Sequence, residues 1–332
     1  MYSIAFALRP SQTANYPWYG VSRRKTPHNY ELSMKQPPIT FVNKTTPEAN
    51  MHKYLFLLLL CIGQSIAHAQ PARLIVRGDD MGFSHSGNEA LVKCYKEGIQ
   101  TSIEVIVPSP WFPEAVQLLK EIPNADIGIH LALTSEWDLV KWRPMTRAES
   151  LVDADGYFFP MVFPNKNYPG RSISENQWKI EDIEREFRAQ IETALRHIPR
   201  ISHVSAHMGC TALSEEVKAM TRRLTREYKI DIDPADHQVQ SLRFDGPHTT
   251  TEQKVGSFLA ALSKMKPGQT YLFVEHPGLD TPELRAIHHI GYENVAEDRQ
   301  GVTDLFTNPE VKAFIQEKGI QLISYRDLTK GK

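Results

Sequence analysis

Short apolar runs and longer amphipathic segments alternate along the chain from residue 73 onward. The apolar runs have the length and composition of buried strands. They lie at 73–78, 102–107, 127–132, 201–206, 229–233, 271–275 and 320–324. The intervening segments carry apolar residues at helical spacing. They lie at 85–97, 112–121, 180–197, 214–227, 251–265, 281–288 and 309–318. The pattern therefore predicts seven strands that alternate with seven helices.

This alternation predicts an α/β fold with a parallel sheet, because parallel neighbours need a helical crossover between them. The number of units favours a single domain over 70–330, built as a seven-stranded (β/α) barrel that is TIM-barrel-like. An open doubly wound sheet is the alternative, and periodicity does not separate the two. Segment 134–178 breaks the pattern, since it is rich in Trp, Tyr, Phe and Pro. We expect a long aromatic loop insertion there, either functional or packed over the barrel rim.

The segment "MHKYLFLLLLCIGQSIAHAQ" has the features of an export signal. A basic start, an apolar run and a small-x-small site predict a secretory signal peptide over 51–69, cut after Ala69. Its apolar run is too short to span a bilayer, so we expect no stable membrane insertion after cleavage; a retained anchor is the alternative. Residues 1–50 have no sustained periodicity and are expected to be disordered or an over-extended gene start. The mature protein would be periplasmic or extracellular.

The composition of the chain excludes some function classes. It has 332 residues, of which 41% are hydrophobic and 23% charged, and its formal net charge is −1. Basic residues form no stripe, so no nucleic-acid partner is expected. Cys94 and Cys210 are too few for a disulfide-built scaffold, and the sequence leaves open whether they pair. It also leaves open whether the protein forms a homo-oligomer.

Ionisable side chains gather where the predicted strands end. They are Asp79, Asp80, His130, His207 and His276. In parallel α/β folds ligands bind at the carboxyl ends of the strands, so these five residues are expected to meet at one rim. Each alone has a structural interpretation, because a lone strand histidine is usually hydrogen-bonded in the core and an Asp pair after Gly is often a turn. Together they indicate a site, since two adjacent carboxylates need a partner that neutralises them.

The segment "ISHVSAHMG" offers two histidines, His203 and His207. On a strand both face the same side, but four residues separate them by roughly 13 Å. Only one can therefore bind a given metal ion, and His207 is nearer the strand exit, which leaves His203 a deeper supporting role. One carboxylate and two imidazoles suit a divalent transition metal. The charge of such an ion would let one Asp bind it while the adjacent Asp stays ionised as a base.

Five short motifs in order carry a resemblance to a known family. They are "RGDDMG" at 77–82, "GIHLALT" at 128–134, "HVSAH" at 203–207, "EHPG" at 275–278 and "SYRDL" at 324–328. In these the chain resembles the YdjC or ChbG family of carbohydrate deacetylases over nearly all of residues 73–328. The resemblance implies a seven-stranded (β/α) barrel that removes acetyl groups from N-acetylated sugars, chitooligosaccharides among them. It also implies a divalent cation, Mg²⁺ as the first expectation and Zn²⁺ as the alternative.

The family's functional residues match positions of this chain one by one. Asp80, His130 and His207 match the metal ligands, Asp79 matches the adjacent catalytic carboxylate, and His276 matches the histidine of an HP motif. We expect Asp79 to take a proton from the attacking water and His276 to protonate the departing amine. The two aspartates could exchange roles.

Two departures from the family pattern bear on the substrate. The family usually reads HxDxH where this chain has Ser205, which is expected to weaken the hydrogen bond behind a metal ligand and to change the sugar accepted. The "TSEW" after His130 points to the same conclusion, and export favours an extracytoplasmic glycan. Trp137, Trp142 and Arg143 are candidate substrate-binding residues. A metal-dependent hydrolase of another amide or a phosphoester, and a non-catalytic glycan-binding barrel, are the alternatives.

Overall fold

The computed structural model describes residues 70–330. The predicted N-terminal extension, 1–50, and the predicted signal peptide, 51–69, lie outside the described residues. Within residues 70–330 no helix is both long enough and apolar enough to cross a membrane. The described residues form one compact unit.

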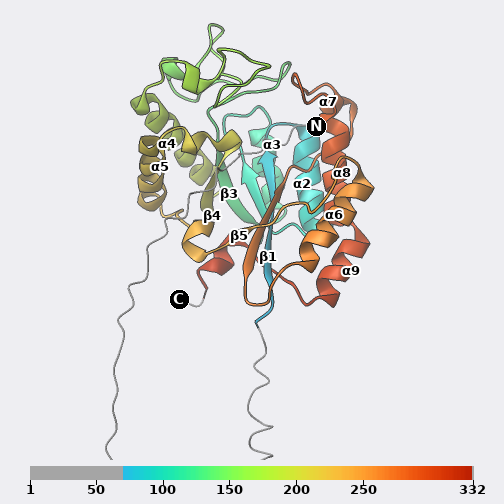
Figure 1. The fold of residues 1–332 in the computed structure, drawn as a ribbon. Coiled ribbons are helices and arrows are strands. Elements are labelled where there is room, and N and C mark those ends of the chain that lie inside the picture. The colour runs from blue at the N-terminus through green and yellow to red at the C-terminus, as the bar shows by residue number, and fades with distance from the viewer. Residues whose placement is uncertain (1–69, 331–332) are drawn as a thin grey trace, which may run out of the picture. The chain divides into compact units, whose positions relative to one another are not determined.

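A parallel sheet forms the centre of this unit (Figure 1). Its strands are β1 (Arg73–Met81), β2 (Ser102–Val105), β3 (Asp126–Leu131), β4 (Ile201–Ala206), β5 (Gln240–Ser241), β6 (Thr270–Glu275) and β7 (Gln321–Leu322). They lie in the order β4-β3-β2-β1-β6-β5, with β7 paired to the first residues of β1. All pairings are parallel. The predicted α/β class with a parallel sheet is confirmed.

The sheet does not close into the predicted barrel among the described strands, because its order ends at β4 on one side and β5 on the other. The strand predicted over 229–233 is wrong. Lys229 has a left-handed backbone with φ of 58°, and the amide of Ile230 bonds back to Thr225, which ends the preceding helix instead of starting a strand. Ile230 belongs to a loop but is buried in the core, which explains why this segment has the apolar alternation of a strand. The outer edge of β4 is left without a strand partner, and the result is a half-barrel.

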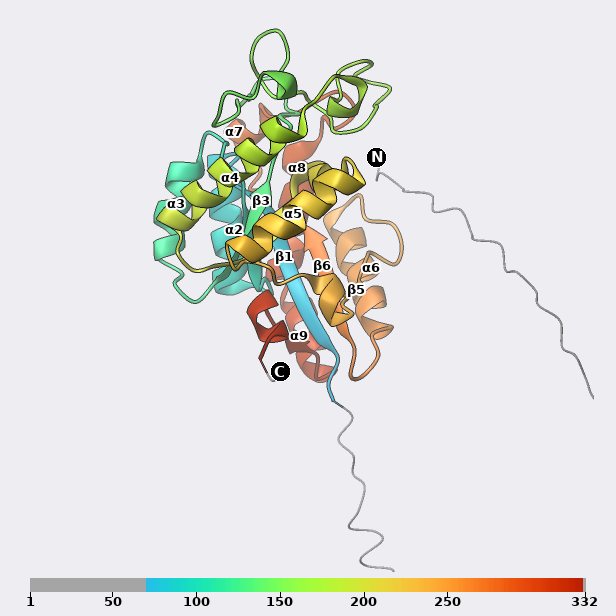
Figure 2. The same cartoon turned by 90° about the vertical axis from the view of Figure 1, so that its left-hand side faces the viewer.

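Helices pack around the sheet on both sides (Figures 1 and 2). They are α2 (His85–Glu97), α3 (Phe112–Lys120), α4 (Ile180–His197), α5 (Glu215–Glu227), α6 (Thr251–Ser263), α7 (Pro282–Arg285), α8 (Val295–Thr307) and α9 (Pro309–Glu317). Neighbouring α4 and α5 are joined by Arg188, whose guanidinium donates to both carboxylate oxygens of Glu227 at 2.6 and 2.8 Å. Helix α8 was not predicted. Its buried face includes Arg299, Gly301 and Thr303, so the apolar periodicity that marks a helix is interrupted there.

The segment between β3 and α4 lies at the end toward which the strands point, at the top of Figure 1. It contains two short 3-10 helices, η1 (Glu149–Leu151) and η2 (Ile173–Glu175). Helix α4 fastens it: Glu186 accepts from the amides of Met145 and Thr146, each at 3.0 Å. The segment is therefore held by α4 at the end of the sheet toward which the strands point.

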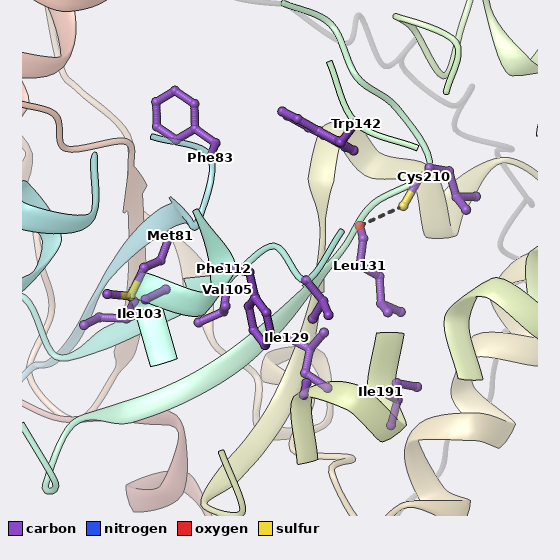
Figure 3. Close-up of a cluster of buried hydrophobic side chains, with 14 of the residues drawn as sticks. Met81, Phe83, Ile103, Val105, Phe112, Ile129, Leu131, Trp142, Ile191 and Cys210 are labelled. Carbon is purple, nitrogen blue, oxygen red and sulfur yellow. Dashed lines mark hydrogen bonds between the residues drawn. The ribbon is translucent and has the colours of Figure 1, made fainter. Parts of the chain in front are cut away.

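Apolar side chains from the sheet and the surrounding helices form the main core (Figure 3). Ile129 and Leu131 of β3 pack there with Ile191 of α4. Cys210 lies at its upper edge, where its thiol donates to the carbonyl of Leu131 at 3.1 Å. Cys94 is buried as well, and both cysteines are free, so Cys94 and Cys210 do not form a disulfide with each other.

Candidate active site

The paired aspartates lie where β1 ends in a bulge. The register of β1 with β2 shifts between Gly78 and Met81, and Asp80 has a left-handed backbone with φ of 71°. Such a conformation costs a non-glycine residue about 1 kcal/mol or more, so its presence marks a constrained position. A Cβ on Gly78 would lie 2.4 Å from Cδ2 of Leu91 in α2, so this residue must be glycine for α2 and β1 to approach. The bulge sends the two carboxylates into different surroundings.

Asp80 faces two histidines. Its Oδ1 lies 3.2 Å from His207 Nδ1 and 3.5 Å from His130 Nε2. One ligand atom from each residue lies within 4.8 Å of the others, and all three residues are buried. Asp80 Oδ1 has no hydrogen-bond partner among the described residues. A buried carboxylate oxygen that faces two imidazole nitrogens fits a divalent cation, so the three residues that the sequence placed together could hold one.

A further carboxylate, Glu136, holds the other face of His207. Its Oε2 lies 3.0 Å from His207 Nε2. Burial disfavours the charged ring, but the carboxylates of Glu136 and Asp80 outweigh it and raise the pKa of His207 to about 10. A carboxylate on the far nitrogen of a ligating histidine orients the ring and fixes its tautomer. Sequence reasoning missed Glu136, although it lies in the "TSEW" segment already noted.

His130 is held from behind by Ser205. His130 Nδ1 lies 2.7 Å from Ser205 Oγ, and Ser205 Oγ in turn donates to Glu104 Oε2. Burial lowers the pKa of His130 well below its usual value, so the ring is neutral. Ser205 therefore still makes a hydrogen bond behind this ligand, and Glu104 lies behind the serine. Glu104 was missed from sequence.

The predicted deeper position of His203 is what the structure shows. Its Nε2 lies 2.6 Å from Glu104 Oε1, and its ring stacks on Tyr325 with centroids 3.6 Å apart. His203 therefore packs below the site and does not reach Asp80.

Asp79 lies beside the cluster, with its Oδ2 3.7 Å from His130 Nε2, and pairs with Arg77. The guanidinium donates to both carboxylate oxygens, at 2.7 and 2.8 Å, and its third nitrogen donates to the hydroxyl of Tyr325 at 3.0 Å. Burial raises the pKa of Asp79 to about 7 against the opposing charge of Arg77. Burial also disfavours the Asp80 anion, but the charges of His276, Arg299 and His207 hold the pKa of that carboxyl well below its usual range. Two adjacent carboxylates thus differ in basicity, which allows one to bind a cation and the other to move a proton.

The rim of the site holds His276 and Arg299. His276 Nε2 lies 3.9 Å from Asp80 Oδ2, and its side chain is 40% exposed. Arg299 donates to the same oxygen at 2.8 Å, and its guanidinium lies 4.5 Å from the ring centroid of Phe83. Arg299 comes from α8, the unpredicted helix, which is why the sequence did not show it.

Of the three candidate substrate-binding residues, Trp137 and Trp142 are enclosed near the site, whereas Arg143 is exposed. Trp137 is 2% exposed and stacks on Phe83 with centroids 5.6 Å apart. Trp142 is 3% exposed, with its ring centroid 6.4 Å from that of His207. Arg143 lies 4.3 Å from the ring centroid of Tyr157. Neither tryptophan offers an open face in this conformation, and their role in sugar binding stays a prediction.

Comparison with known proteins now decides the family. The family model described as YdjC-like protein matches residues 73–317. The chain belongs to the YdjC-like family. The predicted family is therefore confirmed, over a match that includes Asp79, Asp80, His130, His207 and His276.

Curated relatives of this YdjC-like chain carry a common name. A carbohydrate deacetylase of Clostridium beijerinckii is 30% identical, and the aligned part covers 77% of this chain and 100% of the relative. Carbohydrate deacetylase 2 of Listeria innocua is 26% identical over 78% of this chain and 99% of its own length. A crystal structure from Enterococcus faecalis V583, of a protein described in terms of cellobiose-phosphate cleavage, superposes with a TM-score of 0.61 at 22% identity. It covers 78% of this chain and 99% of its own, and shows the fold alone.

Proposed function

We propose that this protein is a carbohydrate deacetylase, a hydrolase that removes acetyl groups from N-acetylated sugars or oligosaccharides with a divalent metal ion. The observation that carries the proposal is the meeting of Asp80, His130 and His207 beside an arginine-bound Asp79. Family membership and relatives named as carbohydrate deacetylases support the reaction class.

Asp80, His130 and His207 would hold the metal ion. At such a site a divalent cation supplies Lewis-acid polarisation of a carbonyl and acidification of bound water. The resemblance favours Mg²⁺, whereas two imidazoles and one carboxylate are a donor set that suits Zn²⁺ better. A panel of both ions in the activity assay separates these two expectations.

Asp79 is proposed as the general base. A carboxyl group whose pKa is raised by burial to about 7 binds a proton readily near neutral pH, as a base at that pH must. Its fixed pairing with Arg77 holds one orientation, with Oδ2 3.7 Å from His130 Nε2 and therefore close to the metal-binding atoms. Asp80 is the weaker base of the pair, which supports Asp79 as the base and Asp80 as the metal ligand over the exchanged roles.

His276 is proposed as the general acid. It lies on the solvent side of Asp80, and its partly exposed side chain can meet a substrate that enters from the rim. Burial lowers the pKa of His276 to about 4, so its protonated form is scarce at neutral pH but is a strong acid. The proton of that form can pass to the departing sugar amine, whose expulsion as an anion is otherwise prohibitive.

The phosphoester alternative gains no support from the two arginines that the sequence offered for it. The cations considered for binding a phosphate are engaged elsewhere: Arg77 with Asp79, and Arg143 with the ring of Tyr157. Export of the protein after removal of residues 51–69 remains part of the proposal. It rests on the basic start, the apolar run and the small-x-small site of that segment.

Acetate release from a panel of N-acetylated sugars and oligosaccharides tests the proposal. The enzyme is stripped with chelator and reloaded with Mg²⁺, Zn²⁺ or Mn²⁺. We expect activity only after reloading, with loss in Asp79→Asn and in His207→Ala. Full activity of the stripped protein would refute metal dependence, and glycan binding without acetate release under every ion would favour the binding-protein alternative.

A further inference from the structure

We propose that Glu104 is a positioning residue that fixes the tautomer of His130 through the hydroxyl of Ser205, so that the bare nitrogen of the imidazole faces Asp80. The inference rests on the proposed function in one respect, since it treats His130 as a metal ligand. Its evidence is a chain of hydrogen bonds across three neighbouring strands.

Counting donors and acceptors fixes each proton in this chain. Glu104 is fully buried, and burial, which favours its neutral form, is outweighed by His203, Arg77 and Ser205, so that its pKa falls to about 2. An ionised carboxylate only accepts, so Ser205 must give its single hydroxyl proton to Glu104. Ser205 can then only accept from His130 Nδ1, 2.7 Å away. A proton on Nδ1 leaves the lone pair of the neutral ring on Nε2, the atom 3.5 Å from Asp80 Oδ1.

The sheet register builds this arrangement. Glu104 of β2 lies opposite Gly128 of β3, which lies opposite His203 of β4, while His130 lies opposite Ser205. All four side chains therefore project from the same face of three adjacent strands. A Cβ on Gly128 would lie 2.2 Å from Glu104 Oε2 and 2.6 Å from His203 Nε2. Gly128 thus makes the space in which the Glu104 carboxylate reaches across β3 to β4.

The two histidines of the candidate metal site are then supported in the same way. Each has a carboxylate on the nitrogen that faces away from Asp80, directly from Glu136 for His207 and through Ser205 from Glu104 for His130. The position where the family resemblance leads one to expect an aspartate holds a serine here, and the negative charge comes from the neighbouring strand instead. Such supporting partners typically contribute 10- to 100-fold to metal affinity.

The test reads the tautomer directly, in protein without metal. Long-range ¹H–¹⁵N spectra of ¹⁵N-histidine-labelled protein report which ring nitrogen carries the proton, with His130 assigned from its loss in His130→Gln. We expect His130 to be protonated on Nδ1. In Glu104→Gln the amide can donate to Ser205, which frees the hydroxyl proton for Nδ1 and lets the Nε2-protonated form appear. Ser205→Ala removes the link and is expected to give the same mixture.

Metal affinity supplies the second readout. By Zn²⁺ titration we expect Glu104→Gln and Ser205→Ala to bind about 10- to 100-fold more weakly. Ser205→Asp combined with Glu104→Gln should recover the affinity, because the new carboxylate accepts from His130 directly. The matched control is Glu186→Gln, which removes an equally buried carboxylate that anchors the loop after β3 and should leave the His130 spectrum unchanged.

The outcomes separate this inference from the proposed function. An Nε2-protonated His130 in the native protein, or unchanged spectra in both Glu104→Gln and Ser205→Ala, would overturn the positioning role even if the enzyme deacetylates sugars. The expected tautomer and its loss in the variants would support the role even if no metal-dependent deacetylation were found.

Discussion

Replacing Arg77 with glutamine should move the acid limb of the activity profile toward alkaline pH. Arg77 makes two hydrogen bonds to Asp79, at 2.7 and 2.8 Å, inside a buried site. Two unit charges about 4 Å apart interact by about 4 kcal/mol at an effective dielectric of 20, equivalent to about three pH units. Since glutamine keeps one donor, we expect the pKa of Asp79 to rise by about one to three pH units.

The sign of the effect follows from the role of Asp79 as a base. Only its ionised form accepts a proton, so kcat/KM falls as pH drops through its pKa. A higher pKa therefore lowers kcat/KM by about 10- to 1,000-fold on the acid limb, at pH values below the pKa of both proteins, and much of the activity returns at alkaline pH. The bound cation lowers the absolute pKa in both proteins, which makes the difference between them the quantity to measure.

The assay is acetate release between pH 5 and 10 at low substrate concentration and saturating metal. Arg200→Gln is the matched control. Arg200 is a partly buried arginine that directly precedes β4, away from the site, and its guanidinium donates to the carbonyl of Leu119 in α3. It should leave the acid limb in place. A uniform loss at every pH in Arg77→Gln, or an acid limb displaced toward lower pH, would refute the assignment of Asp79 as the base.

Three further outcomes follow from the structure. In metal-free protein the carboxylates of Glu136 and Asp80 raise the pKa of His207 to about 10, above its usual 6.5. The protonated His207 therefore contributes fully to stability below pH 6.5, and this contribution is lost as pH rises toward 10. Glu136→Gln should flatten that loss, of a few kcal/mol, in denaturant unfolding across this range; an unchanged slope would contradict the pairing. Gly128→Ala should cost about 1 to 3 kcal/mol of unfolding free energy through its clash with Glu104, and unaltered stability would contradict the close packing. Burial raises the pKa of Cys94 and Cys210 to about 12, so both thiols should react with a thiol reagent only after denaturation, and rapid labelling of native protein would be inconsistent with their burial.

The sequence predicted the strands that carry the site because each is a buried apolar run with a polar end. Strand β4 matches its predicted range, and β1 extends its predicted range through Asp79 and Asp80. Parallel strands bring their carboxyl ends to one edge, so the meeting of Asp80, His130 and His207 followed without knowledge of side-chain positions. The same reasoning correctly separated His203 from that group.

The supporting groups could not be found in this way, because their partners depend on register and on polar burial. Glu104 lies within an apolar strand but reaches a partner two strands away, which only the pairing of β2, β3 and β4 reveals. Arg299 faces inward from a helix whose buried positions are partly polar, so the periodicity that identifies helices was absent. Lys229, which has a left-handed backbone, ends a helix where apolar alternation predicted a strand. Without that strand the sheet does not close into the predicted barrel.

A crystal structure of the Zn²⁺-loaded protein, with the ion located by anomalous scattering, tests the central proposal most directly. We predict one strong peak about 2.0 to 2.2 Å from an Asp80 oxygen, His130 Nε2 and His207 Nδ1. A peak elsewhere, or no peak between these three side chains at a zinc concentration that supports acetate release, would contradict the proposed metal site.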